Sequence, residues 1–337
     1  MPHSIDNEVV GQNTWDQRRT MLEGVVLGAI YGILLRRAVH FNWSSPSPNT
    51  FAVMTATFIF GSPVVIGILT IRRAEAHSPI RVWQWILLPW ISVGLMLVTL
   101  WLFVIEGTIC VVMAAPIALV CASIGGVIGG IWGRLHKPSN RILTCIAVLP
   151  LIFAPLEARV TAPPSTRTVA SEILIHAPAA TIWQNIERVP AIAPSELRST
   201  WTYRIGFPRP IEATLSYEGV GGVRHASFER GLLFIETITA WEPQHRIAFS
   251  IKADSAHIPT TTLDEHVTIG GRYFDVLNGE YTLEPLANGD TMLHLVSHQR
   301  LSTDFNDYAG LWTDAVMQNI QNNILIVIKH RCEARKL

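Results

Sequence analysis

The stretch PLIFAPLEARVTAPP, residues 150–164, separates two parts of the chain that differ in composition. Long apolar runs dominate the sequence before it, and short apolar segments alternate with polar residues after it. Residues 1–160 contain 18 charged residues, whereas residues 161–337 contain 34. This asymmetry predicts a membrane-embedded part followed by a separately folded domain. The predicted parts are a polar lead (1–19), a transmembrane domain (20–157), a linker (158–168) and a folded domain (169–332).

The overall composition excludes several classes of protein. Charged residues make up 15% of the chain, against about a quarter in typical soluble domains. The formal net charge is zero and no basic run is present, so we expect no nucleic-acid partner. Cys110, Cys121, Cys145 and Cys332 have neither metal-site spacing nor a disulfide pattern. We therefore expect no metal and no cofactor.

Five apolar segments in the first half are candidates for membrane helices. A helix needs about 20 apolar residues to cross a hydrocarbon core of about 30 Å. Three segments have this length, whereas the first contains Glu23 and the last contains two prolines, so these two are marginal. This predicts a multi-pass protein of the cell membrane. The expected helices are 20–35, 51–71, 83–104, 108–133 and 141–156.

Glycines recur at every fourth position in the first and fourth of these segments. Such spacing places small residues on one face of a helix, where another backbone can approach closely within a membrane. We expect the first and fourth helices to pack together. The alternative is that these faces join two copies of the chain into a homo-oligomer. The glycines concerned are Gly24, Gly28 and Gly32 in one segment and Gly125, Gly129 and Gly133 in the other.

Arginine and lysine residues in the loops predict the orientation in the membrane. The loops after the second and fourth helices are basic, and basic loops usually face the cytoplasm. Arg36 and Arg37 then lie on the outer side, against this rule. If the segment 141–156 spans, the folded domain is extracytoplasmic, and if it does not, the domain is cytoplasmic. We expect it to span.

The second half combines several short strands with two helices. A strand over 171–178 precedes a short helix that begins near Pro178, and a long helix closes the chain. Its apolar residues recur every four positions from Trp312 to Ile328. A hairpin turn is expected at Asn288 and Gly289. Further strands are expected near 201–206, 211–219, 223–229, 232–241, 247–251, 273–277, 280–286 and 291–300.

Five segments carry a resemblance to a known superfamily: HAPAATIWQNI (176–186), GGVRHASFERG (221–231), LLFIETITAWEPQHRIAFSI (232–251), GEYTLEPLANGDTMLHL (279–295) and YAGLWTDAVMQNIQNNILIVIKHR (308–331). They resemble the START-like or SRPBCC superfamily of polyketide cyclases, dehydrases and lipid-transport proteins. The resemblance covers about residues 168–332 and leaves the membrane half outside it. It implies an α+β helix-grip fold, a curved antiparallel sheet on a long C-terminal helix, attached here to an all-α transmembrane bundle. It also implies a hydrophobic ligand in a cavity between sheet and helix, without a defining catalytic motif.

Glu236 is the leading candidate for a functional side chain. It alternates with Phe234 and Ile238 and therefore shares the apolar face of its strand. Burial there would raise the pKa of the carboxyl group, which could then act as a general acid or base or as a polar anchor for a ligand. The alternative is that this face is solvated and that Leu233 and Ile235 face the core.

Other candidates lie on neighbouring elements. Arg224 and Glu229 could pair across the hairpin with Glu236 or Arg246 near the site, or these could be surface ion pairs that contribute little. His294 and His298 share one face of a strand and lie about 13 Å apart along it, which is too far to bind one metal ion. They line either a cavity or the surface. The segment 259–281 could be a lid over the cavity or an ordinary connection. The candidate ligand-binding residues are Arg224, Phe234, Glu236, His266, Tyr273, His294 and Trp312, the last of which could also belong to the core.

Three functions remain open from the sequence. The leading prediction is a membrane-anchored domain that binds a hydrophobic small molecule or a lipid. The second is an enzyme of the cyclase or dehydratase kind that uses Glu236 as acid or base. The third is a membrane sensor or scaffold whose folded domain binds a protein. An enclosed apolar cavity would favour the first, and two converging titratable groups would favour the second.

Overall fold

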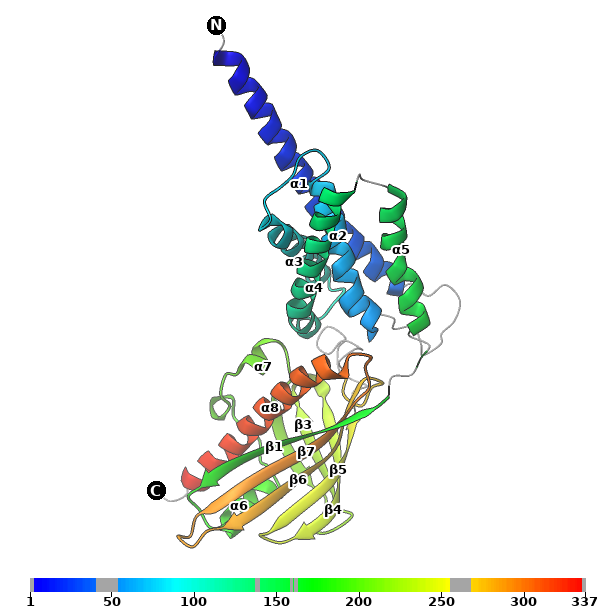
Figure 1. The fold of residues 1–337 in the computed structure, drawn as a ribbon. Coiled ribbons are helices and arrows are strands. Elements are labelled where there is room, and N and C mark those ends of the chain that lie inside the picture. Colours follow the sequence, from blue (N-terminus) through cyan, green and yellow to red (C-terminus); the bar gives the residue numbers. More distant parts are fainter. Residues whose placement is uncertain are drawn as a thin grey trace. The chain divides into compact units, whose positions relative to one another are not determined.

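The protein is described by a computed structural model that covers residues 3–40, 54–136, 140–157, 160, 163–254 and 268–334 (Figure 1). The chain divides into two compact units. One contains residues 1–106 and 111–161, and the other contains residues 107–110 and 162–337. Each unit has its own buried apolar clusters, so each is described by itself.

The N-terminal part is helical. Its elements are α1 (His3–His40), the π-helical turn η2 (Thr57–Gly61), α2 (Ser62–Ala74), α3 (Gln84–Leu102), α4 (Thr108–Leu135) and α5 (Asn140–Glu157). Three helical stretches in the described residues are long and apolar enough to cross a membrane: Thr57–Ala74, Gln84–Leu102 and Thr108–Leu135. These are the three segments expected from length, and α5 carries a shorter apolar helix. Helix α1 begins at His3 rather than at residue 20, because residues 3–19 contain no proline that would stop it.

The glycine faces pack within the chain, but the predicted partners are wrong. A Cβ on Gly28 of α1 would lie 2.3 Å from the Thr70 hydroxyl of α2, and one on Gly125 of α4 would lie 2.0 Å from the Val64 carbonyl oxygen. Both glycine faces therefore pack on α2 instead of on each other. Helix α2 presents its own small residue, Gly67, to α4. Pairing of two copies through these faces remains an untested prediction.

Arg36, one of the two arginines expected on the outer side against the orientation rule, has a counter-charge. The Arg36 guanidinium forms an ion pair with the Glu106 carboxylate, and both side chains are buried. Arg36 lies near the end of α1 and Glu106 follows α3, so these two ends meet. The pair neutralises a buried charge that would be costly if it were unpaired.

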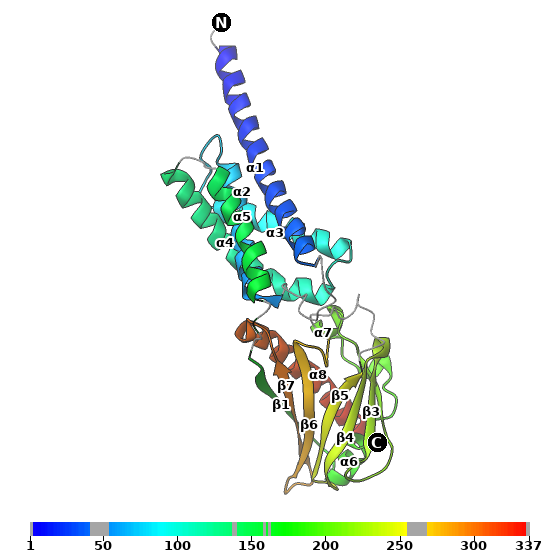
Figure 2. The same ribbon diagram turned by 90° about the vertical axis from the view of Figure 1, so that its right-hand side faces the viewer.

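The C-terminal domain is a seven-stranded antiparallel sheet with a long helix. The strands follow the order β1-β7-β6-β5-β4-β3-β2. Figures 1 and 2 show the sheet curling around α8. The elements are β1 (Ser165–Ile175), α6 (Ala179–Ile186), η3 (Pro194–Glu196), α7 (Trp201–Arg204), β2 (Pro210–Leu215), β3 (Val223–Phe228), η4 (Glu229–Gly231), β4 (Leu233–Glu242), β5 (Arg246–Asp254), β6 (Phe274–Pro285), β7 (Thr291–Leu301) and α8 (Asn306–Ala334).

Several expected boundaries differ from the structure. Strand β1 begins at Ser165, inside the predicted linker, because its polar first half pairs with β7 as far as Leu301. The segment expected as a strand at 201–206 forms the helical turn α7. The two strands expected at 273–277 and 280–286 form one strand, β6, with an irregularity in its pairing near Asn278. The turn at Gly289 is confirmed, with a φ of 86°.

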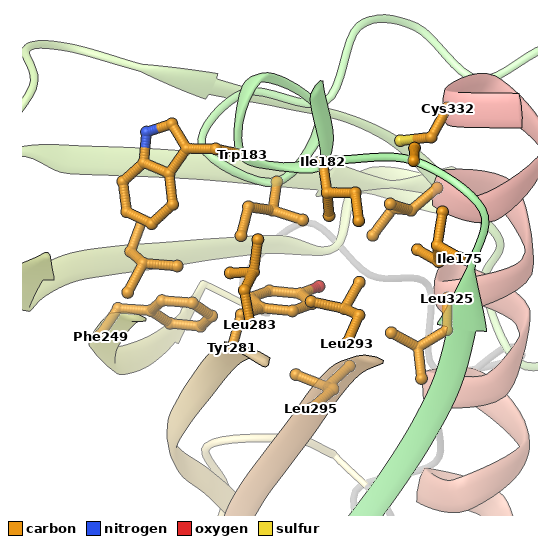
Figure 3. Close-up of a cluster of buried hydrophobic side chains, with 14 of the residues drawn as sticks. Ile175, Ile182, Trp183, Phe249, Tyr281, Leu283, Leu293, Leu295, Leu325 and Cys332 are labelled. Atoms are coloured by element: carbon orange, nitrogen blue, oxygen red, sulfur yellow. The ribbon is translucent and has the colours of Figure 1, made fainter. Parts of the chain in front are cut away.

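One apolar cluster fills the C-terminal domain beside α6 (Figure 3). Alternate residues of β7, such as Leu293, meet Leu325 of α8 and Ile182 of α6, and all three are almost fully buried. Trp183 and Trp241 close the cluster edge to face, with ring centroids 5.0 Å apart. Burying one such aliphatic side chain contributes about 1.5–3 kcal/mol. This cluster holds the helix against the sheet and leaves the other part of the inner face to polar side chains.

Candidate functional site

Strand β4 places Glu236 on the inner face of the sheet. The residue is 5% exposed, and Ile238, two positions along the strand, is 1% exposed. Leu233 and Ile235 on the other face are half-buried. The prediction that Glu236 lies on the buried face of its strand is therefore confirmed.

Arg224 of β3 lies directly opposite Glu236 in the strand register. Its Nη1 lies 2.5 Å from a Glu236 carboxylate oxygen, and the two side chains are 5% and 7% exposed. The pairing predicted from sequence is confirmed, and a surface ion pair is excluded. The other pairing differs, because Arg246 binds Glu280 on the exposed side of the sheet. Glu229 accepts a hydrogen bond from a backbone amide instead.

Two aromatic side chains complete the cluster around Arg224. The Tyr281 hydroxyl of β6 lies beside the Arg224 guanidinium, whose charge acts on the pKa of Tyr281. The Phe249 ring of β5 lies 5.5 Å from the same guanidinium and 6.2 Å from the Tyr281 ring. The ring can lie there because Gly279 has no side chain, and a Cβ would be 2.7 Å from it. Sequence analysis missed Tyr281 and Phe249, although a glycine in mid-strand signals such close packing.

Burial and charge act in opposite directions on this cluster. Burial raises the pKa of Glu236, and the adjacent Arg224 opposes that rise. Burial lowers the pKa of Arg224, but Glu236 and Tyr281 outweigh it, so the guanidinium stays charged. Burial raises the pKa of Tyr281 to about 12, so its hydroxyl keeps its proton at neutral pH. The cluster therefore presents a bound ion pair and a neutral hydroxyl, which suit the polar end of a ligand.

A second group of buried polar side chains joins β1 and β7 to α8. Gln321 Nε2 donates to the Ser297 hydroxyl at 2.9 Å and to the Val169 carbonyl at 3.2 Å. Gln299 Nε2 donates to a carboxylate oxygen of Asp314 at 3.1 Å. Sequence analysis missed this group as well. The signal was the odd-numbered face of β7, where polar residues follow leucines, and every odd position from Thr291 to Leu301 is buried.

Four buried atoms of these two groups have no hydrogen-bond partner among the residues that the structure describes. Leaving a buried polar atom unpaired costs about 1–3 kcal/mol, so native structures usually supply water or a ligand. The four lie on the inner face or on the helix that covers it, and they mark the candidate site. They are Arg224 Nε, Ser171 Oγ, Gln299 Oε1 and Gln321 Oε1.

The structure corrects the prediction for His294. Its two ring nitrogens lie 3.3 and 3.4 Å from the exposed carboxylates of Glu172 and Glu284, on the outer face of the sheet. His298 lies on that face too, 2.7 Å from Asn278 Oδ1. In β7 the odd-numbered residues point inward, so the even-numbered His294 and His298 lie on the outer face.

The remaining candidates are Phe234, Tyr273, Trp312 and His266, of which His266 lies outside the described residues. Phe234 packs edge to face on Phe228, with ring centroids 5.1 Å apart, beside a small apolar cluster. Tyr273 is buried, and half-buried Trp312 packs against Trp201. Their role in binding stays a prediction. His266 and most of the expected lid, 259–267, lie outside the described residues, so neither is placed.

Comparison with known proteins shows a likeness of fold for half of the chain. No known family matches the sequence, and no curated protein matches it. Matching structures include a START superfamily protein from Mycobacterium smegmatis (12% identity, TM-score 0.33), the dynemicin-locus protein DynU16 (15%, 0.31) and truncated norcoclaurine synthase from Thalictrum flavum (12%, 0.31). Each match covers 50% of this chain, and 98%, 48% and 93% of the respective structure, so the chain spans about half of DynU16. These values say nothing about activity, ligand or partners.

The architecture itself determines the fold class. An N-terminal region of apolar helices is followed by a curled antiparallel sheet and a long C-terminal helix, α8, on its inner side. The C-terminal domain therefore has the helix-grip fold that the sequence predicts, a curved antiparallel sheet on a long C-terminal helix.

Proposed function

We propose that the C-terminal domain binds a hydrophobic small molecule or lipid between its sheet and α8, and that the N-terminal helices anchor it in the cell membrane. The apolar part of the ligand lies against the cluster of Figure 3. One polar group of the ligand lies at Arg224, Glu236 and Tyr281. An anchor suits such a ligand, because hydrophobic molecules partition into bilayers.

The observation that carries this proposal is the buried Arg224–Glu236 pair and its unpaired Nε atom. Apolar residues of similar size are often as stabilising as a buried ion pair, or more so. Stability alone therefore gives little reason for charges at this place. A ligand oxygen that accepts from Arg224 Nε would complete the hydrogen bonding of the cluster.

Acid–base catalysis by Glu236 is the weaker alternative. A general base must be free to take a proton from its substrate. The Glu236 carboxylate instead accepts a short hydrogen bond from Arg224. Tyr281 stays protonated at neutral pH, since burial raises its pKa to about 12. The cluster is thus better suited to holding a ligand than to moving protons.

Co-purification of lipids tests the binding proposal. The full chain is purified in mild detergent, and bound lipids are extracted and identified by mass spectrometry. We expect a ligand that is lost in the double variant Arg224→Met/Glu236→Leu, which removes both charges together. The matched control is Arg246→Met/Glu280→Leu, which makes the same changes in the exposed pair. A ligand retained by the first variant, or no ligand in the wild-type protein, would contradict the proposal.

We further propose that the protein is a multi-pass membrane protein whose C-terminal domain is extracytoplasmic. The support comes from the two ends of α2, which ends at the basic residues Arg72 and Arg73. The opposite end begins beside Glu157, the last residue of α5, whose carboxylate accepts from the backbone amides of Ala56 and Thr57 at 2.8 and 2.9 Å. If the basic end is cytoplasmic, α5 ends on the other side.

A reporter tests this topology. An enzyme that is active only in the cytoplasm is fused to the C-terminus, and a second reporter that is active only outside is fused at the same place. We expect activity from the second fusion alone. Activity of the cytoplasmic reporter would show that α5 does not span.

A further inference from the structure

The unpaired atoms on α8 and β7 are hydrogen-bond acceptors, and their identity follows from their neighbours. Gln321 Nε2 donates to the Val169 carbonyl oxygen, which has no hydrogen to give in return. The orientation of the amide is therefore set by its surroundings, and the atom left over is Oε1. This oxygen is buried without a donor among the described side chains and backbone.

Gln299 repeats the same arrangement. Its Nε2 donates to the Asp314 carboxylate, which can only accept, so Gln299 Oε1 is the second unpaired acceptor. Ser171, on β1 beside β7, adds a buried hydroxyl that has no partner in the described part of the chain. These two acceptors and the hydroxyl lie on β1, β7 and α8. Hydrogen-bond donors from outside the protein would pair the acceptors.

The charged side chains of the site, Arg167 with Asp314 and Arg224 with Glu236, are paired with each other. Arg167 binds Asp314 through two hydrogen bonds, of 2.9 and 2.5 Å. Arg224 on the inner face is bound to Glu236. An ionised ligand group would find no free counter-charge in either pair, and burying an unpaired charge is costly. The unpaired acceptors Gln321 Oε1 and Gln299 Oε1 are therefore suited to a neutral group that donates hydrogen bonds.

We propose that the ligand is an uncharged amphiphile with a hydroxyl group, and that this hydroxyl donates to Gln321 Oε1. The inference rests on the proposed binding function and names the class of ligand. A hydroxyl suits both kinds of unpaired atom, since it donates one hydrogen bond and accepts others. The apolar body of the molecule then packs against the cluster that contains Leu293 and Leu325.

Binding of three matched probes tests this inference. The full chain in mild detergent is titrated with a long-chain primary alcohol, its methyl ether and the fatty acid of equal length, and binding is measured by displacement of a fluorescent apolar probe. We expect the alcohol to bind about tenfold more tightly than the ether, because the ether cannot donate and leaves the acceptor unpaired. The ionised acid should bind more weakly than the alcohol.

Two variants on α8 test whether Gln321 causes the preference for the alcohol over the ether. Gln321→Leu removes one unpaired acceptor and should reduce the preference for alcohol over ether to about twofold or less. Gln318→Leu makes the same change at an exposed position of the helix and should leave the preference unchanged. Thermal unfolding of each variant shows whether it is folded, and the wild-type comparison stands without them.

The outcomes separate this inference from the proposed function. Equal binding of alcohol and ether by the wild-type protein would overturn the hydroxyl assignment, since water would then satisfy the acceptors, while the binding function would stand. Tightest binding of the fatty acid would overturn it as well. Absence of binding by all three probes would count against the binding function itself, and against the hydroxyl assignment with it.

Discussion

Arg224–Glu236 and Arg246–Glu280 are two cross-strand ion pairs of the same residue types in one sheet, and they lie on opposite faces of it. The inner pair is 5% and 7% exposed, and the outer pair is 41% and 36% exposed. The inner charges are cut off from water and depend on each other, whereas the outer charges remain solvated. The comparison shows that the face of a strand, and not the residue type, determines what an ion pair does.

The largest expected effect comes from breaking the inner pair on one side. Arg224→Met leaves the Glu236 carboxylate buried without a counter-charge and should lower the free energy of unfolding by about 3–5 kcal/mol at neutral pH. Burial already raises the pKa of Glu236 beside Arg224, and removing the opposing charge of Arg224 raises it further. The variant should therefore recover stability as the pH falls and lose it as the pH rises through that pKa.

Chemical denaturation at neutral and mildly acidic pH, followed by hydrogen exchange of β4, measures this change. The control is Arg246→Met, which removes the corresponding cation of the outer pair and should change the unfolding little, because water replaces it. Equal losses in the two variants would mean that the inner pair is solvated and that the comparison between the faces does not hold.

A smaller effect is expected at the glycine that makes room for the cluster. In Gly279→Ala the new Cβ would lie 2.7 Å from the Phe249 ring, so the ring must move away from its place near Arg224. Such overpacking costs about 1–3 kcal/mol. Denaturation combined with the probe-displacement assay should show lower stability and weaker ligand binding together.

Gly94→Ala is the matched control, because nothing lies within 4 Å of a Cβ at that helical position. It should leave ligand binding unchanged and should not lower stability, since alanine favours a helix more than glycine does. A Gly279→Ala protein with wild-type binding would show that the position of Phe249 does not matter to the site.

The smallest expected effect concerns the outer pair in acid. The hydrogen bond from Arg246 lowers the pKa of Glu280 below its ordinary value. A carboxyl group with a lowered folded-state pKa stabilises the protein above its unfolded pKa, and this contribution is lost as the pH falls through the folded-state pKa.

As the pH falls from about 5 to about 3, the Glu280→Gln protein should therefore lose slightly less stability than the wild-type protein. Thermal unfolding of the wild-type and variant proteins across this range measures the difference. A wild-type advantage that grows toward lower pH would have the wrong sign and would contradict the assigned cause.

Much of the helix and strand pattern could be predicted because it depends on local periodicity. The alternation around Glu236 placed its carboxylate on the buried face, and the length of the apolar runs identified three helices that could cross a membrane. The pattern around His294, a candidate ligand-binding residue, did not show which face of its strand is buried. His294 and His298 alternate with buried residues of β7, and polar residues occur on both faces of that strand.

The sequence by itself determined which residues share a face, because backbone geometry repeats every two residues in a strand and about every 3.6 in a helix. It thus determined the order of most elements, the inward direction of Glu236 and the existence of the long C-terminal helix. Only the tertiary structure decided which faces meet. It brought Gln321 to Ser297 and Tyr281 to Arg224, and it placed both glycine faces against α2. Such contacts join segments far apart in the chain, and they depend on strand register and helix packing, which local periodicity does not specify.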